Sequence, residues 1–382
     1  MKTLRKQLSG RSLLKKIRKH FERIPDSRRA ASVSIPLADA LMSGFAVFSL
    51  KFPSLLQFEQ QAQEEQSRCD QKLGKGAPLV RRFSNLKTLY GVTHVPSDTQ
   101  MRSILDEAEP ENVRPAFSQL FELLQRGKEL KRFEFFQGNY LLSIDGTGYF
   151  SSSDVHCESC MKKVVSKNTN PKTIYYHQML GAAVVHPDLS TVIPVCPEPI
   201  LKQDGNDKND CERNACRRFL AKFREDHPRL PVIVVQDALA ANAPHVKDLK
   251  DYGMHFILGV KPDSHVQLFR GLLKQEKVGL VLHHEEREVI GHKIRKRRTH
   301  CFRYINEVLL SGGDVNLSVN FLEYWETTQW TDPQGNPQKT EYHFSWVTDL
   351  PIKKENLMQI MRGGRARWKI ESVPQAHKRR FS

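Results

Sequence analysis

The sequence lacks the long apolar runs that membrane insertion or secretion requires. Its basic start is not followed by an uncharged apolar core and a small-residue cleavage site, so no signal peptide is predicted. The longest apolar stretch, Ile35–Leu50, contains Pro36 and Asp39 and is too short to span a bilayer. We therefore expect a protein without a membrane partner.

Cysteine is also scarce, and its count is odd. Seven cysteines in 382 residues do not pair completely into a disulfide framework. Because the chain is basic and shows no secretory signal, the cysteines predict a reducing compartment, the cytoplasm.

Acidic residues are in deficit. The chain has 59 Lys and Arg against 43 Asp and Glu, a net charge of +16 and a pI near 9.5. The segment Met1–Arg29 carries over half of this excess, with eleven basic residues against Glu22 and Asp26. A clustered positive charge predicts a polyanionic partner such as nucleic acid, whereas evenly spread charge would indicate only a well-solvated surface. The chain is long enough for two or three domains.

Residues 1–139 are predicted to form a helical, basic DNA-binding domain. Apolar residues recur there at helical spacing. A helix over Phe83–Tyr90 is followed by Gly91, and Ser97 begins another helix with Gln100 in position for a capping box. Two helices joined in this way are compatible with a helix-turn-helix that reads DNA, but the sequence alone favours the alternative, an ordinary helical bundle.

Two apolar strands are predicted to end in carboxylates. Leu141–Ile144 leads into Asp145, and Val232–Gln236 leads into Asp237. A short helix and the strand His255–Val260 follow, which makes a β-α-β unit with Asp237 at the carboxyl edge of the sheet. Alone, each Asp could simply cap a turn. Together they offer the hard oxygen ligands that divalent cations prefer.

A Cys/His cluster follows the first of these strands. His156, Cys157 and Cys160 lie close together in sequence, and His177 comes after a Lys- and Asn-rich turn. These are the ligand types of a structural zinc site, although the spacing to His177 is loose and free thiols are the alternative.

The predicted order is three antiparallel strands, a helix, a strand ending in Asp, a helix and a strand. This is the order of an RNase H-like fold: an α/β mixed sheet with flanking helices. The chain resembles the DDE transposases of bacterial insertion sequences, of the insertion-sequence-four type. The resemblance rests on the order and spacing of four fragments: Ser143–Thr147, Val234–Ala238, Trp346–Leu350 and Arg367–Glu371.

The resemblance implies a set of site residues. Asp145, Asp237 and Glu371 would be the catalytic, metal-binding carboxylates, holding Mg²⁺ or Mn²⁺. In the family pattern Tyr-x₂-Arg-x₃-Glu-x₆-Lys, the Arg and Lys positions are Arg367 and Lys378, which would contact DNA phosphates. The chain departs from this pattern at two positions, Gly364 in place of the Tyr and Pro374 in the expected helix. Because it ends eleven residues after Glu371, we expect a C-terminally truncated copy with weak or no strand transfer.

Residues 263–342 are rich in strand-forming residues and are predicted to be a β-rich insertion domain. The RNase H-like catalytic domain would then comprise 140–262 plus 343–382. Five basic residues of the insertion are candidate phosphate contacts: Lys293, Arg295, Lys296, Arg297 and Arg298. A charged edge strand that resists aggregation is the alternative.

The resemblance implies a transposase that binds the ends of an insertion sequence and catalyses DNA cleavage and strand transfer by metal-dependent phosphoryl transfer. The alternatives are a nuclease on the same fold and a catalytically impaired, DNA-binding remnant. The resemblance further implies double-stranded DNA as partner, a homodimer in the DNA complex and a place at the bacterial nucleoid.

Overall fold

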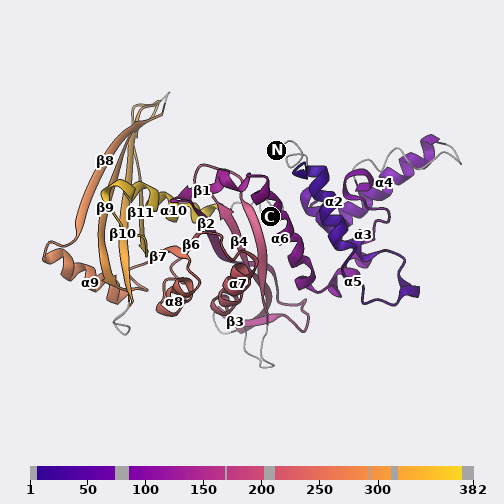
Figure 1. Ribbon diagram of the computed structural model, residues 1–382. Coiled ribbons are helices and arrows are strands. Elements are labelled where there is room, and N and C mark those ends of the chain that lie inside the picture. Colours follow the sequence, from indigo (N-terminus) through magenta and orange to yellow (C-terminus); the bar gives the residue numbers. More distant parts are fainter. Residues whose placement is uncertain are drawn as a thin grey trace. The chain divides into compact units, whose positions relative to one another are not determined.

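The chain forms two compact units, which are described separately here. The computed structural model describes residues 7–73, 86–167, 170–201, 211–291, 294–310 and 317–371. The described residues up to Arg132 belong to the first unit, and those from Phe133 onward belong to the second (Figure 1). Across these described ranges, no helix has both the length and the hydropathy needed to cross a membrane.

The first unit is built from helices. Its main helices are α2 (Gly10–Phe21), α3 (Leu37–Ser49), α4 (Leu55–Leu73), α5 (Asp98–Asp106) and α6 (Arg114–Arg126). Shorter helical turns occupy Ala30–Ser32, Leu86–Tyr90, Pro110–Val113 and Leu130–Phe133. The predicted capping box is present, because Ser97 accepts a bond from the Gln100 N–H and the Gln100 side chain accepts one from the Ser97 N–H. Of the predicted helix before Gly91, only Leu86–Tyr90 lies within the described residues.

A buried carboxylate organises the core of this unit. Asp39 on α3 is fully buried and pairs with Arg18 of α2. It also accepts bonds from the Thr93 hydroxyl and from the N–H groups of Thr93 and His94. One of the N-terminal basic residues is therefore used inside the unit, which leaves fewer cations for an external partner.

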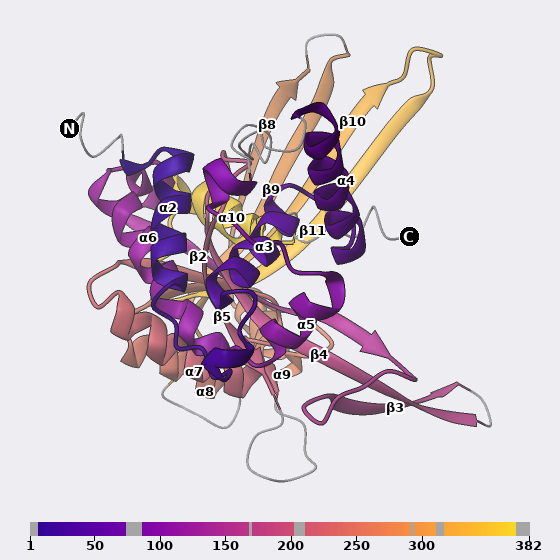
Figure 2. The same cartoon turned by 90° about the vertical axis from the view of Figure 1, so that its right-hand side faces the viewer.

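The second unit contains one eleven-stranded mixed sheet. Its strands are β1 (Glu134–Phe136), β2 (Asn139–Ser152), β3 (Met161–Lys167), β4 (Asn170–Val185), β5 (Ile193–Ile200), β6 (Val232–Gln236), β7 (His255–Gly259), β8 (Leu282–Ile290), β9 (Lys296–Leu309), β10 (Ser318–Thr331) and β11 (Pro337–Thr348). The order is β3-β4-β2-β6-β7-β11-β10-β9-β8, with β5 also paired to β4 and β1 to β2. Figure 2 shows the β3–β4 hairpin extending away from the rest of the sheet.

The predicted strands and helices before residue 262 are present, together with two strands that were not predicted, β1 and β3. β2, β4 and β5 pair antiparallel, whereas β6 lies parallel to both β2 and β7. The helices α7 (Glu212–Asp226) and α8 (Ala243–Asp251) fall between these strands in sequence. All five residues of β6 are buried, as expected for a central strand covered on both faces.

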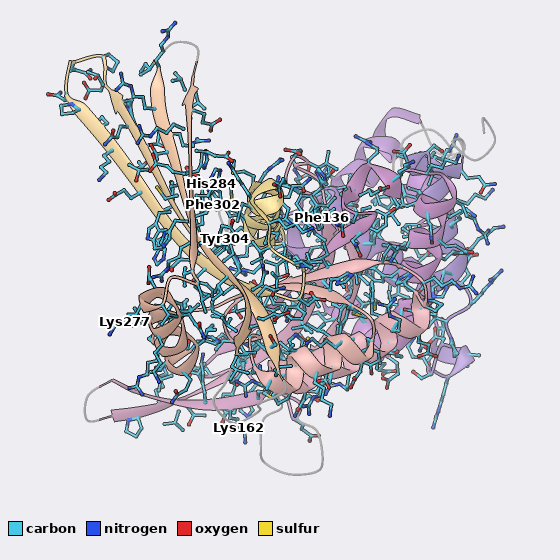
Figure 3. The ribbon with its side chains drawn as sticks, turned by 60° about the vertical axis from the view of Figure 1, so that its left-hand side comes forward. Phe136, Lys162, Lys277, His284, Phe302 and Tyr304 are labelled. Atoms are coloured by element: carbon cyan, nitrogen blue, oxygen red, sulfur yellow. The ribbon has the colours of Figure 1, made fainter. Side chains whose placement is uncertain are left out.

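Helices cover both faces of the sheet. Alternate side chains of β6 show this, because Ile233 and Val235 share a core with the last helix, α10 (Leu357–Arg365). Gln236 faces the other way, where it bonds to His245 of α8. In Figure 3, Phe302 and Tyr304 of β9 lie toward α10, in the same core. The 3₁₀-helix η7 (Ala366–Lys369) continues α10 on this face.

The predicted β-rich insertion continues the sheet. β11 pairs with β7 through Trp346–Thr348, so β8 to β11 extend the same sheet and do not form a separate one. The predicted boundaries at residues 263 and 342 thus do not separate two sheets. This region also contains a helix that the strand-forming composition did not predict, α9 (Val266–Lys277), with Leu268 and Leu272 buried one turn apart.

Candidate active site

The two aspartates come from neighbouring parallel strands, but only Asp237 directly follows the end of its strand, β6. Asp145 lies in the middle of β2, which continues to Ser152 in pairing with β4, so the prediction that this strand ends at Asp145 is wrong. β2 and β6 pair in register from Tyr140 with Val232 to Ser143 with Val235. Asp145 and Asp237 each lie two residues further along the chain from this last pair, Ser143 and Val235. Both carboxylates are partly buried and line the same pocket of about 260 Å³.

Glu371 reaches this site from the end of the chain's last described segment. Its carboxylate lies 3.0 Å from a guanidinium nitrogen of Arg367, and the same nitrogen lies 3.4 Å from Asp145. The Ser143 hydroxyl donates a hydrogen bond to the Arg367 carbonyl at 3.1 Å, which fixes η7 against β2. Arg367 therefore bridges Asp145 and Glu371, although more than 200 residues separate these two carboxylates in sequence.

The helix expected to carry Glu371 ends before that residue. α10 stops at Arg365, and a 3₁₀-helix continues to Lys369. Glu371 stands in the following turn, where its N–H donates to the Trp368 carbonyl at 3.2 Å. Tightening of a last helical turn in this way is common. The predicted effect of Pro374 on this segment lies outside the described residues.

Gly364, the departure from the family pattern, has a steric explanation. A Cβ placed there would lie 2.5 Å from the Trp346 indole. The two residues are buried where α10 crosses the sheet, so the indole of β11 occupies the space that a side chain at position 364 would need. A larger residue fits only if Trp346 moves.

Glu212 is a fourth carboxylate at the site, which the sequence reasoning missed. It is the first residue of α7 and lines the same pocket as Asp145 and Asp237. A Cβ built on Gly146 would lie 2.2 Å from a carboxylate oxygen of Glu212, so glycine is required next to Asp145 for this approach. An acid in the first turn of a helix is ordinarily explained by the helix dipole, and only the folded structure reveals its neighbours.

Burial and mutual repulsion raise the proton affinity of this acidic group. Burial raises the pKa of Asp145; Glu371 and Asp237 add to the rise, whereas Arg367 opposes it. Burial likewise raises the pKa of Glu212, with Asp145 and Asp237 contributing. The site thus holds more negative charge than Arg367 compensates, which is a setting that attracts a cation.

The donor set suits a hard divalent ion, although the carboxylates are not gathered as a coordination sphere. Carboxylate oxygens are the ligands that Mg²⁺ and Mn²⁺ prefer. Within the described part of the chain, however, a single group of three or more potential ligand residues has its atoms all within 4.8 Å of one another, and it is Cys157, Cys160 and His177. At the acidic site, the Arg367 guanidinium lies between Asp145 and Glu371.

The candidate DNA-contacting residues differ in solvent exposure and in whether an acidic side chain already pairs with them. Arg295 and Arg297 are exposed near the start of β9, and Lys296 lies over the Trp330 ring, 4.0 Å from its centroid. Arg298 instead pairs with Glu288 at 3.2 Å and Glu326 at 3.5 Å. Lys293 and Lys378 lie outside the described residues.

A second pocket, of about 320 Å³, lies between β9 and α10. Arg298, Arg362, Arg365 and Lys369 line it together with Glu288 and Glu326. Arg365 pairs with Glu326 at 2.7 Å, so part of this basic lining is already neutralised.

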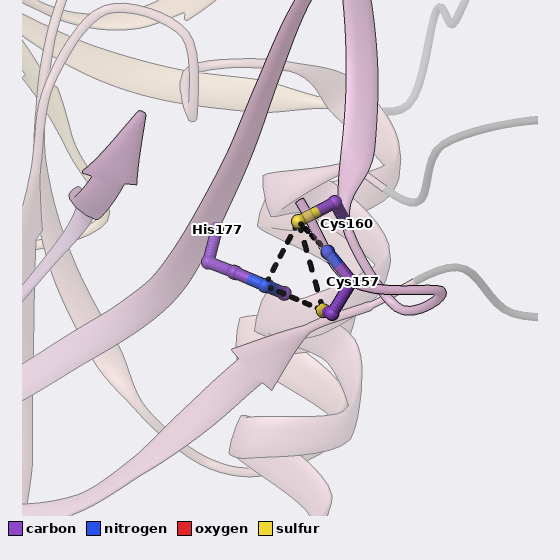
Figure 4. Close-up of side chains that lie close together, drawn as sticks. All are labelled: Cys157, Cys160 and His177. Carbon is purple, nitrogen blue, oxygen red and sulfur yellow. Dashed lines mark hydrogen bonds between the residues drawn. The ribbon is translucent and has the colours of Figure 1, made fainter. Parts of the chain in front are cut away.

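Three of the four predicted zinc ligands come together, and one of them, His177, pairs on β4 with Phe150, five residues beyond Asp145 on β2. The sulfurs of Cys157 and Cys160 lie 3.6 Å apart, and His177 Nε2 lies 3.3 and 3.2 Å from them (Figure 4). His156 is not in this group, because its ring stacks on Tyr175 with centroids 4.0 Å apart.

Comparison with protein-family models and with curated proteins gave no match for this chain. A proposal about its function therefore depends on the residues and the geometry described above.

Proposed function

We propose that this chain is a transposase of the DDE type, which binds the ends of an insertion sequence and cleaves and transfers DNA strands. The observation that carries the proposal is that Asp237 and Glu371, from distant parts of the sequence, both lie close enough to Asp145 to raise its pKa. Shared carboxylates at the carboxyl edge of an α/β sheet are typical of sites for metal-dependent phosphoryl transfer.

The order of the strands supports an RNase H-like catalytic core. The antiparallel strands β2 to β5 are followed by β6 and β7, and β6 lies parallel to both β2 and β7. Asp145 is on β2, and Asp237 directly follows the neighbouring strand β6. This pairing brings residues about 90 positions apart into one site, as a phosphoryl-transfer centre requires.

Each acidic residue would have a distinct role. Asp145 and Asp237 would hold the divalent ion, and Glu371 would complete the set of carboxylates. When bound, Mg²⁺ or Mn²⁺ lowers the pKa of an attacking water or 3′-hydroxyl and stabilises the leaving oxygen. Arg367 positions Glu371 beside Asp145 through its two contacts. Arg213, an exposed basic residue of the same pocket, would contact DNA phosphates, whereas Arg217 is already paired with Asp248 at 3.0 Å.

Double-stranded DNA is the partner that the charge favours. The net charge of +16 and the exposed Arg295 and Arg297 support phosphate contacts. A homodimer in the DNA complex and a place at the bacterial nucleoid belong to the same proposal.

The test is a cleavage and strand-transfer assay with Mg²⁺ and with Mn²⁺ on DNA that carries the ends of the element. We expect Asp145→Asn and Asp237→Asn each to reduce cleavage by at least 100-fold, since metal-binding carboxylates contribute several kcal/mol to such reactions. DNA affinity should remain within about threefold of the unaltered chain. Glu341→Gln, on the exposed part of β11, is the matched control and should leave both properties unchanged.

The outcomes separate the alternatives. Metal-dependent cutting without strand transfer would replace the transposase with a nuclease on the same fold. DNA binding without cleavage in the presence of either metal would support the other alternative, a catalytically impaired remnant that only binds DNA. Activity that survives both Asp→Asn changes would refute the assignment of this site.

A further inference from the structure

The cluster formed by Cys157, Cys160 and His177 has the geometry of a metal site. In tetrahedral zinc sites Zn–S is about 2.3 Å and Zn–N about 2.0–2.1 Å, so that neighbouring ligand atoms lie roughly 3.5–3.8 Å apart. The three distances in this cluster are 3.6, 3.3 and 3.2 Å. Each distance lies within a few tenths of an ångström of the spacing expected for tetrahedral zinc ligands. Figure 4 shows the three side chains converging on a common point.

The backbone is folded to present both sulfurs in one direction. The Cys160 N–H donates to the Cys157 carbonyl at 3.2 Å, and the Cys157 N–H donates to the Cys160 sulfur at 3.3 Å. This tight turn follows from the two-residue spacing of the cysteines. An N–H directed at a sulfur stabilises the thiolate form, which is the form that binds metal.

The histidine is fixed by packing so that Nε2 faces the sulfurs. Its ring stacks on Tyr149, with centroids 5.8 Å apart, and contacts Phe150 at 5.7 Å. The other ring nitrogen, Nδ1, is buried and has no hydrogen-bond partner among the described residues. Among the described residues, the polar atoms that the His177 imidazole contacts are therefore the two sulfurs.

A disulfide does not account for the arrangement. Cys157 and Cys160 are not disulfide-bonded. Their sulfurs lie 3.6 Å apart, against about 2.05 Å in a disulfide. A bond between them would also leave His177 Nε2 aimed at sulfurs that no longer accept a proton or a metal.

We propose that Cys157, Cys160 and His177 bind one Zn²⁺ ion, with water as the fourth ligand, and that the ion fastens the segment between β2 and β3 to β4. Binding displaces one proton from each thiol to solvent, and the neutral imidazole donates its Nε2 lone pair. Because β4 pairs along its length with β2, the ion would secure the far end of the strand pair that carries Asp145. It would also fix the base of the β3–β4 hairpin, where Lys162 and Lys163 lie over Tyr175 and Tyr176. The inference is independent of the proposed transposase function.

The test measures metal content and a spectroscopic signature in the full chain. Reduced protein is freed of metal with a chelator, titrated with Zn²⁺ or Co²⁺, passed through a desalting column and analysed for bound metal. We expect one Zn²⁺ per chain and thiolate-to-Co²⁺ charge-transfer absorption with the cobalt form. Zinc should raise the thermal midpoint of unfolding.

Variants assign the ligands. Cys157→Ser with Cys160→Ser should abolish zinc retention and the charge-transfer absorption, and His177→Gln should weaken Zn²⁺ binding at least tenfold. Cys211→Ser, at an exposed cysteine outside the cluster, should retain one Zn²⁺. His156→Gln should bind Zn²⁺ within twofold of the unaltered chain, because its ring stacks on Tyr175.

Three outcomes would overturn the proposal. They are reduced protein without bound zinc, equal zinc in the double serine variant, and a loss of zinc in His156→Gln as large as in His177→Gln. If the double variant does not fold, as judged by circular dichroism, the Co²⁺ spectrum of the unaltered chain tests the proposal instead. Cobalt binding without thiolate charge-transfer absorption would exclude the cysteines as ligands.

Discussion

Asp39 is a single fully buried carboxylate that accepts hydrogen bonds from four groups: the Arg18 guanidinium, the Thr93 hydroxyl and the N–H groups of Thr93 and His94. Burial alone would raise the pKa of its carboxyl, but the Arg18 guanidinium and the bonds from Thr93 and His94 outweigh burial and hold the pKa below its ordinary value. A carboxylate with a lowered pKa in the folded state stabilises the fold above its unfolded-state pKa. This stabilisation is lost as the pH falls through the folded-state pKa.

We expect Asp39→Asn to destabilise the first unit by about 3 kcal/mol at pH 7, because Arg18 would lose its buried partner. The difference between the variant and the unaltered chain should shrink as the pH is lowered through the acidic range. Urea unfolding at a series of pH values measures this. Asp106→Asn at the end of α5 is a control with an exposed side chain and should change stability by less than about 0.5 kcal/mol. An equal loss of stability at acid and neutral pH would contradict the electrostatic explanation.

The pKa of Glu212 shifts in the opposite direction from that of Asp39. Burial and the neighbouring Asp145 and Asp237 raise its pKa, so its charge opposes folding at neutral pH. The stability that its protonated form contributes is present at low pH and lost as the pH rises through the raised pKa. Glu212→Gln should therefore raise the thermal midpoint at pH 7 in chelator, and it should reduce the further rise that Mg²⁺ produces.

Glu225→Gln on the exposed end of the same helix is the matched control, and it should change neither quantity. A lower midpoint for Glu212→Gln in chelator would show that this carboxylate is stabilising and would remove it from the acidic site.

At the scale of helices and strands, the sequence predicted those features that depend on residues close together in the chain. The Ser97 capping box and the buried run of β6 depend on neighbouring residues, and both were predicted. The pairing of β11 with β7 and the position of Glu212 depend on contacts across the fold, for which a single sequence carries little signal. The sequence predicted that a helix carries Glu371, but α10 ends at Arg365 and the following 3₁₀-helix ends at Lys369, before that residue.

Two helical glycines provide a matched pair for testing packing. A Cβ at Gly364 would lie 2.5 Å from Trp346, whereas one at Gly271 of α9 would meet nothing within 4 Å. Gly364→Ala should cost about 1–3 kcal/mol through overpacking. Gly271→Ala should stabilise the chain by about 0.5–1 kcal/mol, because alanine is the better helix former.

Chemical unfolding of the two variants measures the difference. If Gly364→Ala is as stable as Gly271→Ala, the indole of Trp346 yields at little cost and the close contact does not constrain this helix.

At the scale of the whole molecule, the net positive charge predicts binding to DNA that depends strongly on salt. If six or more phosphates are contacted, affinity for duplex DNA should fall by roughly 10³ between 50 and 200 mM salt. Arg295→Ala with Arg297→Ala should reduce the slope of log affinity against log salt by about two, since both side chains are exposed.

The matched control is Arg287→Ala on the neighbouring strand β8, whose guanidinium pairs with Glu285 at 2.6 Å. This variant should change the slope by less than half as much. Fluorescence anisotropy with labelled duplex at several salt concentrations gives both slopes. A flat salt response of the unaltered chain would exclude phosphate contacts as the source of its affinity.

The contact between Gly364 and Trp346 also has a consequence for how such sequences change over evolutionary time. Neither position can vary independently, because the space near α10 holds one large side chain and is already filled from β11. A first step to tyrosine at 364 would be deleterious until 346 became smaller, so the two substitutions are expected to be inherited together. An alignment of related chains should show this as covariation: a bulky residue at one position with a small one at the other. Related chains that carry bulky residues at both positions would show that the backbone of α10 shifts to admit them.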